Sequence, residues 1–337
     1  MRKVIYILLP IFMSMFAVSC IDEEEFSDNP SGNFEALWKI MDEHYCFFQY
    51  KYDTYGVDWD EVYAKYSQQI DNGMTESQLF EVLGNMLGEL RDGHVNLYSP
   101  FDNARNWSWK EDYATNFSDS LLRVYLGTDY MIASGIYYRK LDDNIGYVYC
   151  SSFENDLGSG NLDEIMLELA TCNGLIVDVR GNGGGMLTSA EELAARFTDE
   201  KILVGYMKHK TGTGHNDFSD YEEQTLAPST GIRWHKNVVV LTNREVFSAA
   251  NEFVKYMKCC PNVVVVGDNT GGGSGMPFSS ELPNGWGVRF SACPMYDRDK
   301  NDTENGIAPD YNVSLTDEDF AKNKDTIIEF ARTLLNQ

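Results

Sequence analysis

Positively charged residues are scarce in this chain of 337 residues: 27 Lys and Arg stand against 52 Asp and Glu, giving a formal net charge of −25. Nucleic acids and anionic lipid headgroups both need a cationic surface on the protein that binds them. The charge therefore argues against either as a partner. It favours solubility and carries no information about the fold.

The usual spacings of metal and nucleotide sites are missing. No two cysteines are spaced C-x-x-C, and the glycine-rich stretch 181–185 is not followed by the Lys-Ser/Thr pair of a P-loop. We therefore expect no metal, cofactor or nucleotide. If the protein is exported, disulfides could form among the six cysteines that follow residue 20: Cys46, Cys150, Cys172, Cys259, Cys260 and Cys293.

The apolar run at residues 4–18 lacks the length of a comfortable membrane span. It follows Arg2 and Lys3 and ends at Ala17-Val18-Ser19-Cys20, which resembles a bacterial lipobox. Residues 1–19 are thus predicted to be a lipoprotein signal peptide, with Cys20 as the lipidated first residue of the mature chain. An ordinary secretory signal cleaved nearby is the alternative.

Residues 20–32 are predicted to be an acidic tether between the lipid and the folded protein. Turn-forming residues at 28–32 end the tether, so folded structure should begin near Asn33. The acidic run at 22–25 also resembles the tract that directs some Gram-negative lipoproteins to the cell surface. We expect an outer-membrane lipoprotein that faces either the periplasm or the outside of the cell.

Residues 33–100 are predicted to form an N-terminal helical subdomain. Apolar residues recur at helical spacing in three segments: 34–41, 59–66 and 79–90. Thr75-Glu76-Ser77-Gln78 has the pattern of a capping box. Asp92-Gly93-His94 should form the turn after the third helix, followed by a short extended run.

Residues 101–337 are predicted to form an α/β core, after a polar loop at 101–119. Strand-like and helix-like segments then alternate, which is typical of a buried, largely parallel sheet. The expected strands are 121–126, 131–138, 145–150, 175–179, 238–241, 263–266 and 286–290. The expected helices are 162–169, 187–197, 246–257 and 327–335, and the polar stretch 209–234 should cover the edge of the sheet.

Ser248 lies where an expected strand turns into an expected helix. A hydroxyl at a helix start is close to unpaired backbone N–H groups and to the positive end of the helix dipole, and both can hold an oxyanion. This is a suitable position for a nucleophile. The alternative is that Ser248 only caps the helix, as serine commonly does.

A nucleophilic serine needs a base, a group that orients the base, and donors for the oxyanion. Of the five histidines, His94 is the one at a glycine-flanked turn, although it could be a structural histidine. His209 and His215, at the ends of the polar stretch, are the next candidates. The glycines at 183–185 would let a substrate carbonyl approach backbone N–H groups, or could serve only as a tight turn.

Five motifs resemble those of one family and occur in the same order. They are Asp92-Gly93-His94 (family DGH), 175–187 (LIIDLRNNPGGLL), Ser248-Ala249-Ala250-Asn251 (SASE or SAAE), 264–270 (VVGEKT) and 306–310 (G-x-x-PD). Over about residues 33–335 the chain resembles the tail-specific (C-terminal processing) and tricorn-core serine peptidases. This resemblance implies a crotonase-like α/β fold, with a ClpP-like ββα core and an N-terminal helical subdomain.

The chain also departs from the family pattern. The tail-specific branch has a lysine base twenty-five positions after the serine, where this chain has Gly273. The resemblance therefore implies the tricorn-type branch, with His94 as base, although that branch has a serine where Gly93 stands. The branch's orienting glutamate best matches Glu304, with Asp310 as the alternative. The stretch between His94 and residue 145 is too short for the PDZ domain common in tail-specific members.

Together these observations predict a serine endopeptidase acting on extracytoplasmic peptides or proteins. Ser248 would be the nucleophile, His94 the base and Glu304 the orienting carboxylate. The N–H groups of Gly184 and Ala249 would form the oxyanion hole. Two alternatives remain: a non-catalytic ligand- or peptide-binding lipoprotein on the same fold, and a CoA-ester enzyme on the related crotonase fold. The oligomeric state is left open.

Overall fold

The computed structural model describes residues 26–106, 108–111 and 113–337. The predicted signal peptide, Cys20 and the acidic run at 22–25 lie outside the described residues. Within the described part of the chain, no helix combines the length and the apolar character needed to span a membrane.

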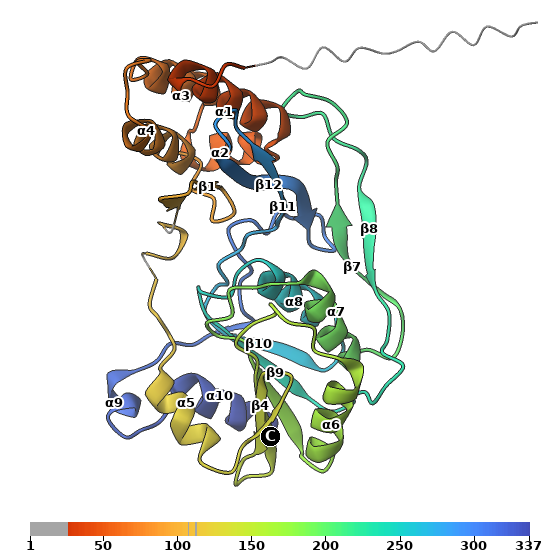
Figure 1. Ribbon diagram of the computed structural model, residues 1–337. Helices are drawn as coiled ribbons and strands as arrows, with labels where there is room; N and C mark the ends of the chain where they lie inside the picture. Colours follow the sequence, from red (N-terminus) through yellow and green to blue (C-terminus); the bar gives the residue numbers. More distant parts are fainter. Residues whose placement is uncertain (1–25, 107, 112) are drawn as a thin grey trace, which may run out of the picture.

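Four helices form the N-terminal end of the described chain (Figure 1): α1 (Pro30–His44), α2 (Phe48–Tyr55), α3 (Trp59–Ser67) and α4 (Glu76–Gly88). Three of them were predicted, and α2 was missed. Helix α1 begins before the predicted start at Asn33, because the Asn29 side chain accepts from the N–H of Gly32 and Pro30 occupies the first turn. The predicted capping box between Thr75 and Gln78 is confirmed.

The largest sheet has seven strands in the order β13-β10-β9-β6-β5-β4-β3. Strands β13 to β5 run parallel, and β4 and β3 are antiparallel additions at one edge. The bounds are β3 (Met131–Ala133), β4 (Ile136–Lys140), β5 (Ile145–Tyr149), β6 (Gly174–Asp178), β9 (Val238–Thr242), β10 (Val263–Gly267) and β13 (Tyr311–Asn312). The predicted α/β fold with a largely parallel sheet is confirmed.

Helices cover both faces of this sheet, which explains why its central strands β5, β6 and β9 are buried and largely apolar (Figure 1). On one face Val148, Val177 and Val240 pack against three helices: α6 (Ser159–Leu169), α7 (Leu187–Ala194) and α8 (Ala249–Met257). On the other face their strand neighbours, among them Ile176 and Val239, pack against α5 (Asp119–Leu126) and α10 (Thr326–Leu335). The short elements η1 (Ser108–Lys110), η2 (Ala195–Phe197) and α9 (Asp317–Phe320) complete the helices.

The prediction of a strand at 121–126 was wrong, because this segment is helix α5. Ser118 caps the helix, accepting from the N–H of Leu121. Leu122, Tyr125 and Leu126 share the face that is buried against the sheet, at helical spacing. The predicted strand 131–138 is instead a hairpin of β3 and β4, with its turn at Ser134 and Gly135, both at positive φ.

A second sheet, antiparallel throughout, was largely missed by the sequence analysis. Its order is β2-β1-β12-β7-β8, with β11 also paired to β12. The bounds are β1 (Asn96–Tyr98), β2 (Asn103–Arg105), β7 (Ile202–Met207), β8 (Glu222–Leu226), β11 (Gly275–Glu281) and β12 (Gly287–Tyr296). Val288 and Phe290 of β12 share a hydrophobic core with α1 to α4, so the helical region is completed by strands from near the C-terminus.

The prediction that residues 209–234 cover a sheet edge needs correction, because β8 within this stretch is itself the edge strand of the second sheet. Strands β7 and β8 form a long hairpin that spans the space between the large sheet and the helical region (Figure 1). At its tip, His215 hydrogen-bonds to Asp42 of α1 at 2.7 Å and stacks on Phe48. The hairpin therefore ties the two ends of the molecule together.

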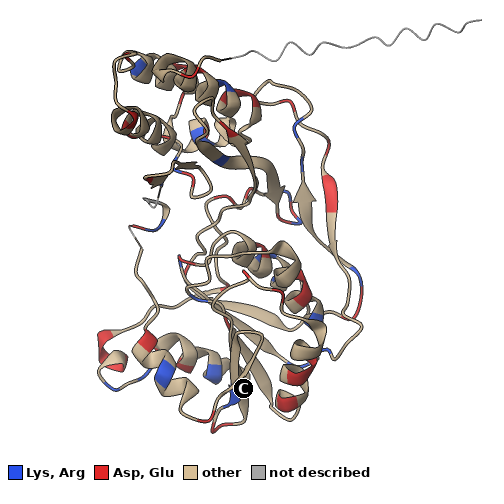
Figure 2. Cartoon of the chain, viewed as in Figure 1, with Lys and Arg blue, Asp and Glu red and all other residues tan. Residues whose placement is uncertain are grey.

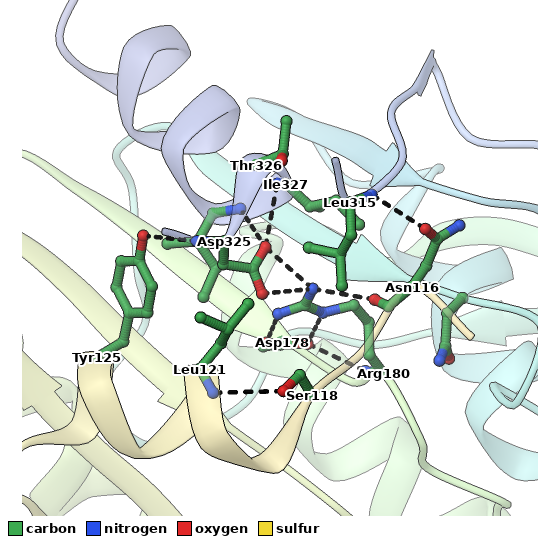
Figure 3. Close-up of polar contacts among 12 residues, drawn as sticks. Asn116, Ser118, Leu121, Tyr125, Asp178, Arg180, Leu315, Asp325, Thr326 and Ile327 are labelled. Atoms are coloured by element: carbon green, nitrogen blue, oxygen red, sulfur yellow. Dashed lines mark hydrogen bonds and ion pairs between the residues drawn. The ribbon is translucent and has the colours of Figure 1, made fainter. Parts of the chain in front are cut away.

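Arg180, which is fully buried, joins three separate segments just before the glycine turn (Figure 3). Its guanidinium group donates to both carboxylate oxygens of Asp178 at 2.9 and 2.7 Å. It also donates to Asp325, which caps α10, and to the backbone oxygen of Asn116. Although burial acts in the opposite sense, these two carboxylates raise the pKa of Arg180. The cluster fixes the start of the glycine turn in space.

Arg180→Met should lower the free energy of unfolding by about 3–5 kcal/mol, because it leaves two buried carboxylates without a cation. Arg233→Met is the matched control. Arg233 pairs with Asp199 on the surface at 2.9 Å, so a loss below about 1 kcal/mol is expected. Urea unfolding of the purified proteins measures both. Equal losses would contradict the role given to the buried cluster.

Candidate active site

Ser248 stands between β9 and α8 in a strained backbone conformation, with φ 58° and ψ −125°. A positive φ is unfavourable for a residue with a Cβ and persists only where the surroundings impose it. Although Ser248 is at the N-cap position, its side chain makes no capping hydrogen bond. Its Oγ instead lies 2.9 Å from Nε2 of His94. The capping interpretation is therefore wrong for the side chain.

Neighbouring backbone holds this turn. The N–H of Ser248 donates to the oxygen of Gly272 at 2.9 Å, and the N–H of Phe247 donates to Asn182 at 3.1 Å. Gly184 packs directly against the turn: a Cβ at this position would come within 2.8 Å of the Ser248 Cβ. The glycine stretch thus allows a close approach to the nucleophile in addition to forming a turn.

His94 is 4% exposed and is held through its backbone. Asp92 Oδ1 accepts from the N–H of His94 at 2.7 Å, and Asn96 donates to the His94 oxygen at 2.8 Å. The other oxygen of Asp92 accepts from Tyr45 and Ser291. The predicted turn after α4 therefore presents the imidazole to Ser248, 154 positions away in the chain.

The ring of Phe247 explains the two glycines at which the chain departs from the family pattern. A Cβ on Gly93 would lie 2.8 Å from Phe247 Cζ and 2.6 Å from Trp109 Nε1. A Cβ on Gly273, which has φ +75°, would lie 2.4 Å from the same Phe247 atom. Neither the serine of the tricorn branch nor the lysine of the tail-specific branch fits unless this ring moves.

Neither predicted orienting carboxylate reaches His94. Glu304 is buried, and accepts from Lys51 Nζ at 3.1 Å and from the N–H of Ser274 at 3.0 Å. Asp310 accepts from Lys258 and from the N–H of Val265. No described side chain makes a hydrogen bond to the buried Nδ1 of His94, and the backbone of Gly275 is the group that acts on the ring as an acceptor. The prediction that Glu304 orients His94 directly needs correction. Its carboxylate instead accepts from the N–H of Ser274, in the loop beside the imidazole.

Burial dominates the electrostatics of the base and lowers the pKa of His94 to about 4. Asp92 and the backbone of Gly275 act in the opposite sense, while Arg289 and Arg105 add to the lowering. The imidazole is therefore neutral over the physiological range, as a general base must be. Burial and Asp92 also raise the pKa of Glu304 to about 8, with Lys51 opposing them.

The two predicted oxyanion donors differ in availability. No described group accepts from the N–H of Ala249, in the first turn of α8. The N–H of Gly184 already donates to Asn182 Oδ1 at 2.9 Å. The prediction of Gly184 as an oxyanion donor therefore needs correction, because its N–H already has an acceptor. The N–H of Gly185, the next along, has no acceptor among the described residues.

The remaining candidates lie in other environments. His209 is close to Glu222 and Cys293, and His215 contacts Asp42, so each has its own partners. Asn251, at the family's glutamate position, accepts from Thr270 Oγ1 at 2.6 Å. Within the described ranges, no three His, Cys, Asp or Glu side chains are grouped closely enough to hold a metal.

Two residues of the site were not predicted, Lys51 and Trp109. Lys51 is on the missed helix α2, and a single lysine among aromatic residues gave no signal. Trp109 stacks on Phe247 with ring centroids 4.5 Å apart, and its segment appeared in the sequence as a polar loop. Both are brought to the site by the tertiary fold.

Comparisons with known proteins identify the family of the chain. Residues 144–313 match the model of peptidase family S41, and residues 26–88 match the model of the tricorn protease C1 domain. The carboxy-terminal processing protease CtpA of Bacillus subtilis (strain 168) is 26% identical over 184 residues, which cover 54% of this chain and 38% of that protein. The carboxyl-terminal-processing protease of Synechocystis sp. is 25% identical over 51% of this chain. The chain thus spans less than half the length of both relatives.

Solved structures extend the match over most of the chain. A candidate peptidase from Parabacteroides merdae ATCC 43184 is 52% identical, with a TM-score of 0.87 over 92% of this chain and 97% of that one. Mature CPAF complexed with lactacystin has a TM-score of 0.68 at 11% identity, covering 91% of this chain and 97% of that one. The tricorn protease has a TM-score of 0.57 at 18% identity, covering 91% and 36%. The last two share the fold alone. The predicted family resemblance is confirmed.

The rate at which a serine-directed fluorophosphonate labels Ser248 should rise with pH through about 4, because only neutral His94 can accept the Oγ proton. The rate should be flat well before the ordinary histidine value of about 6.5. Stopped labelling reactions across a pH series measure this limb, with Ser248→Ala as the blank. An acidic limb at or above 6.5 would contradict the effect of burial.

Proposed function

Since the chain belongs to peptidase family S41, we propose that it is a serine endopeptidase with Ser248 as nucleophile and His94 as general base. The observation that carries this proposal is the 2.9 Å contact between Oγ and Nε2, made by a serine in a strained conformation that its helix does not use as a cap. Strain of this kind is concentrated at functional sites.

In the proposed reaction, Oγ of Ser248 attacks the carbonyl carbon of the scissile bond while its proton passes to Nε2 of His94. The N–H of Ala249 stabilises the oxyanion, with the N–H of Gly185 as the second donor. His94 then protonates the leaving amine, and the C–N bond breaks. A water molecule, deprotonated by His94, hydrolyses the acyl-serine and restores both residues.

We place the substrate in the groove between the helical region and residues 101–106, with Trp109 in its wall. This groove has a volume of about 1350 Å³ and is lined by apolar and polar side chains, including Phe80, Arg91, Trp109 and Asn305. Trp109 connects it to the site, because its ring stacks on Phe247, the residue before the nucleophile. Concave sites of mixed lining are where ligands usually bind.

A non-catalytic binding protein on the same fold is the alternative function. Such a protein has no need for a strained serine in contact with a neutral, buried histidine. Reaction with a fluorophosphonate separates the two functions, because a binding protein would leave the probe unreacted.

Ser248→Ala and His94→Ala should each reduce peptide hydrolysis by at least about a thousandfold. The double variant should be little worse than either, because residues that act as one unit are not additive. Turnover of a fluorogenic peptide library, with unfolding curves to confirm the fold, gives the measurement. Hydrolysis by Ser248→Ala at a comparable rate would overturn the mechanism.

We further propose that the peptidase acts outside the cytoplasm, attached to the outer membrane by lipid on Cys20. The lipobox-like sequence 17–20 supports this location. Figure 2 marks Asp and Glu positions in red on helices at both ends of the molecule. Such a surface favours a lipid anchor over electrostatic adhesion to anionic headgroups. Its substrates would be exported peptides or proteins.

Mass spectrometry of the mature protein should find a diacylated cysteine at position 20 as the first residue. Cys20→Ala should release the protein from the membrane fraction, since the anchor would be lost. Protease shaving of intact cells then tells a surface-facing from a periplasm-facing protein. An unmodified N-terminus cleaved elsewhere would contradict the anchor.

A further inference from the structure

Lys51 is a buried cation close to the candidate site. It belongs to α2, is 2% exposed, and lies within 6.0 Å of the ring centres of Phe47, Tyr50 and Tyr55. Its Nζ donates to Glu304 Oε1 at 3.1 Å and to the backbone oxygen of Arg91 at 3.4 Å. Burying a lysine is costly unless it has a specific partner, so this position calls for an explanation.

Glu304, the partner of Lys51, binds the loop at residues 272–275, which runs past Ser248. Its second carboxylate oxygen accepts from the N–H of Ser274 at 3.0 Å, and its backbone oxygen accepts from the N–H of Gly273 at 3.0 Å. Two consecutive N–H groups of the loop are therefore bound by this one residue. Since Lys51 binds the other carboxylate oxygen, Lys51 fixes the orientation of the Glu304 carboxylate.

The 272–275 loop contacts both Ser248 and His94. The oxygen of Gly272 accepts from the N–H of Ser248 at 2.9 Å. At the other end of the loop, the backbone of Gly275 lies beside the imidazole of His94 and raises its pKa, as a hydrogen-bond acceptor does. A shift of residues 273 and 274 would therefore displace the nucleophile relative to its base.

We propose that Lys51 is a positioning residue of the peptidase: its ammonium group holds the Glu304 carboxylate against the 272–275 loop, and the loop holds Ser248 and His94 at reacting distance. This inference rests on the proposed function. It also gives Glu304 an indirect role, in place of the direct contact with His94 that was expected. The helical region thus supplies a cation to the site as well as the base.

Charge explains why a lysine is needed there. Burial raises the pKa of Glu304 most, Asp92 and Asp302 raise it further, and Lys51 is the group that opposes them. The pKa of Lys51 is in turn raised by Glu304 and Asp92 although burial acts against it. The other nearby titratable groups have pKa values raised by burial and are neutral at pH 7: Tyr45, Cys46 and Tyr50. Without Lys51, three carboxyl groups would face one another.

The test compares four variants by the rate of fluorophosphonate labelling of Ser248, which needs no knowledge of the natural substrate. They are Lys51→Met, Glu304→Gln, the double variant, and Lys65→Met as a control. Lys65 forms an exposed ion pair with Glu89, so its loss should leave the rate unchanged. Lys51→Met should label about a hundredfold more slowly, as expected for a misplaced catalytic pair.

The double variant distinguishes positioning from a simple loss of folding. The amide introduced by Glu304→Gln keeps an oxygen that can accept from the N–H of Ser274 and needs no cation, so the double variant should label at least about tenfold faster than Lys51→Met. A folded Lys51→Met protein that labels at the wild-type rate would overturn the proposal. So would a folded double variant as slow as Lys51→Met. A wild-type protein that does not label at all would instead refute the proposed function.

Stability against pH provides a second readout. In Lys51→Met the pKa of Glu304 should rise further above its wild-type value of about 8. Between the unfolded value of about 4.3 and about pH 8 both proteins carry the same penalty on the folded state, so the extra penalty on the variant appears only as pH rises above about 8. The melting temperature of Lys51→Met relative to wild type should therefore fall above about pH 8, and that of the double variant should not. Loss of the packing of the lysine stem alone would give a difference independent of pH.

Discussion

The position of the Phe247 ring is the constraint on which the site depends. The ring fills the space in front of residues 93 and 273 and stacks on Trp109. Because the ring occupies this space, the turn that carries His94 and the loop that borders Ser248 must both be glycine at their closest points. With the lysine position closed by packing, the imidazole delivered by the turn after α4 is the group that lies against the serine, which is why we propose it as the base.

The large sheet and the position of Ser248 between a strand and a helix could be predicted because their signals are local. The apolar strands that precede Arg180 and Asn243, the glycines and the small residues after Ser248 each carry their own pattern. The second sheet could not be predicted, since its strands pair across long separations, such as Asn96 with Arg289. The 121–126 segment was assigned to a strand because its consecutive apolar residues obscure the helical spacing that burial later selects.

Within the site, the pairing of Ser248 with His94 could be predicted from the sequence. The contacts of the nearby carboxylates could not. A carboxylate was expected on Nδ1 of His94 by analogy, yet the chain directs Asp92 to the backbone of the turn and Glu304 to a loop and a lysine. These roles depend on the direction in which each carboxylate points. Such directions are set by the packing of α2 and β12, which no motif in the chain records.

The crowding around Phe247 also has an evolutionary consequence. A lysine at position 273 would have to displace the aromatic ring, and a smaller residue at 247 would leave the histidine turn and Trp109 without support. In a chain packed in this way, replacing Gly273 by lysine therefore requires a simultaneous change at Phe247. A single substitution at either position is disfavoured by this hydrophobic contact, whatever chemistry the base performs.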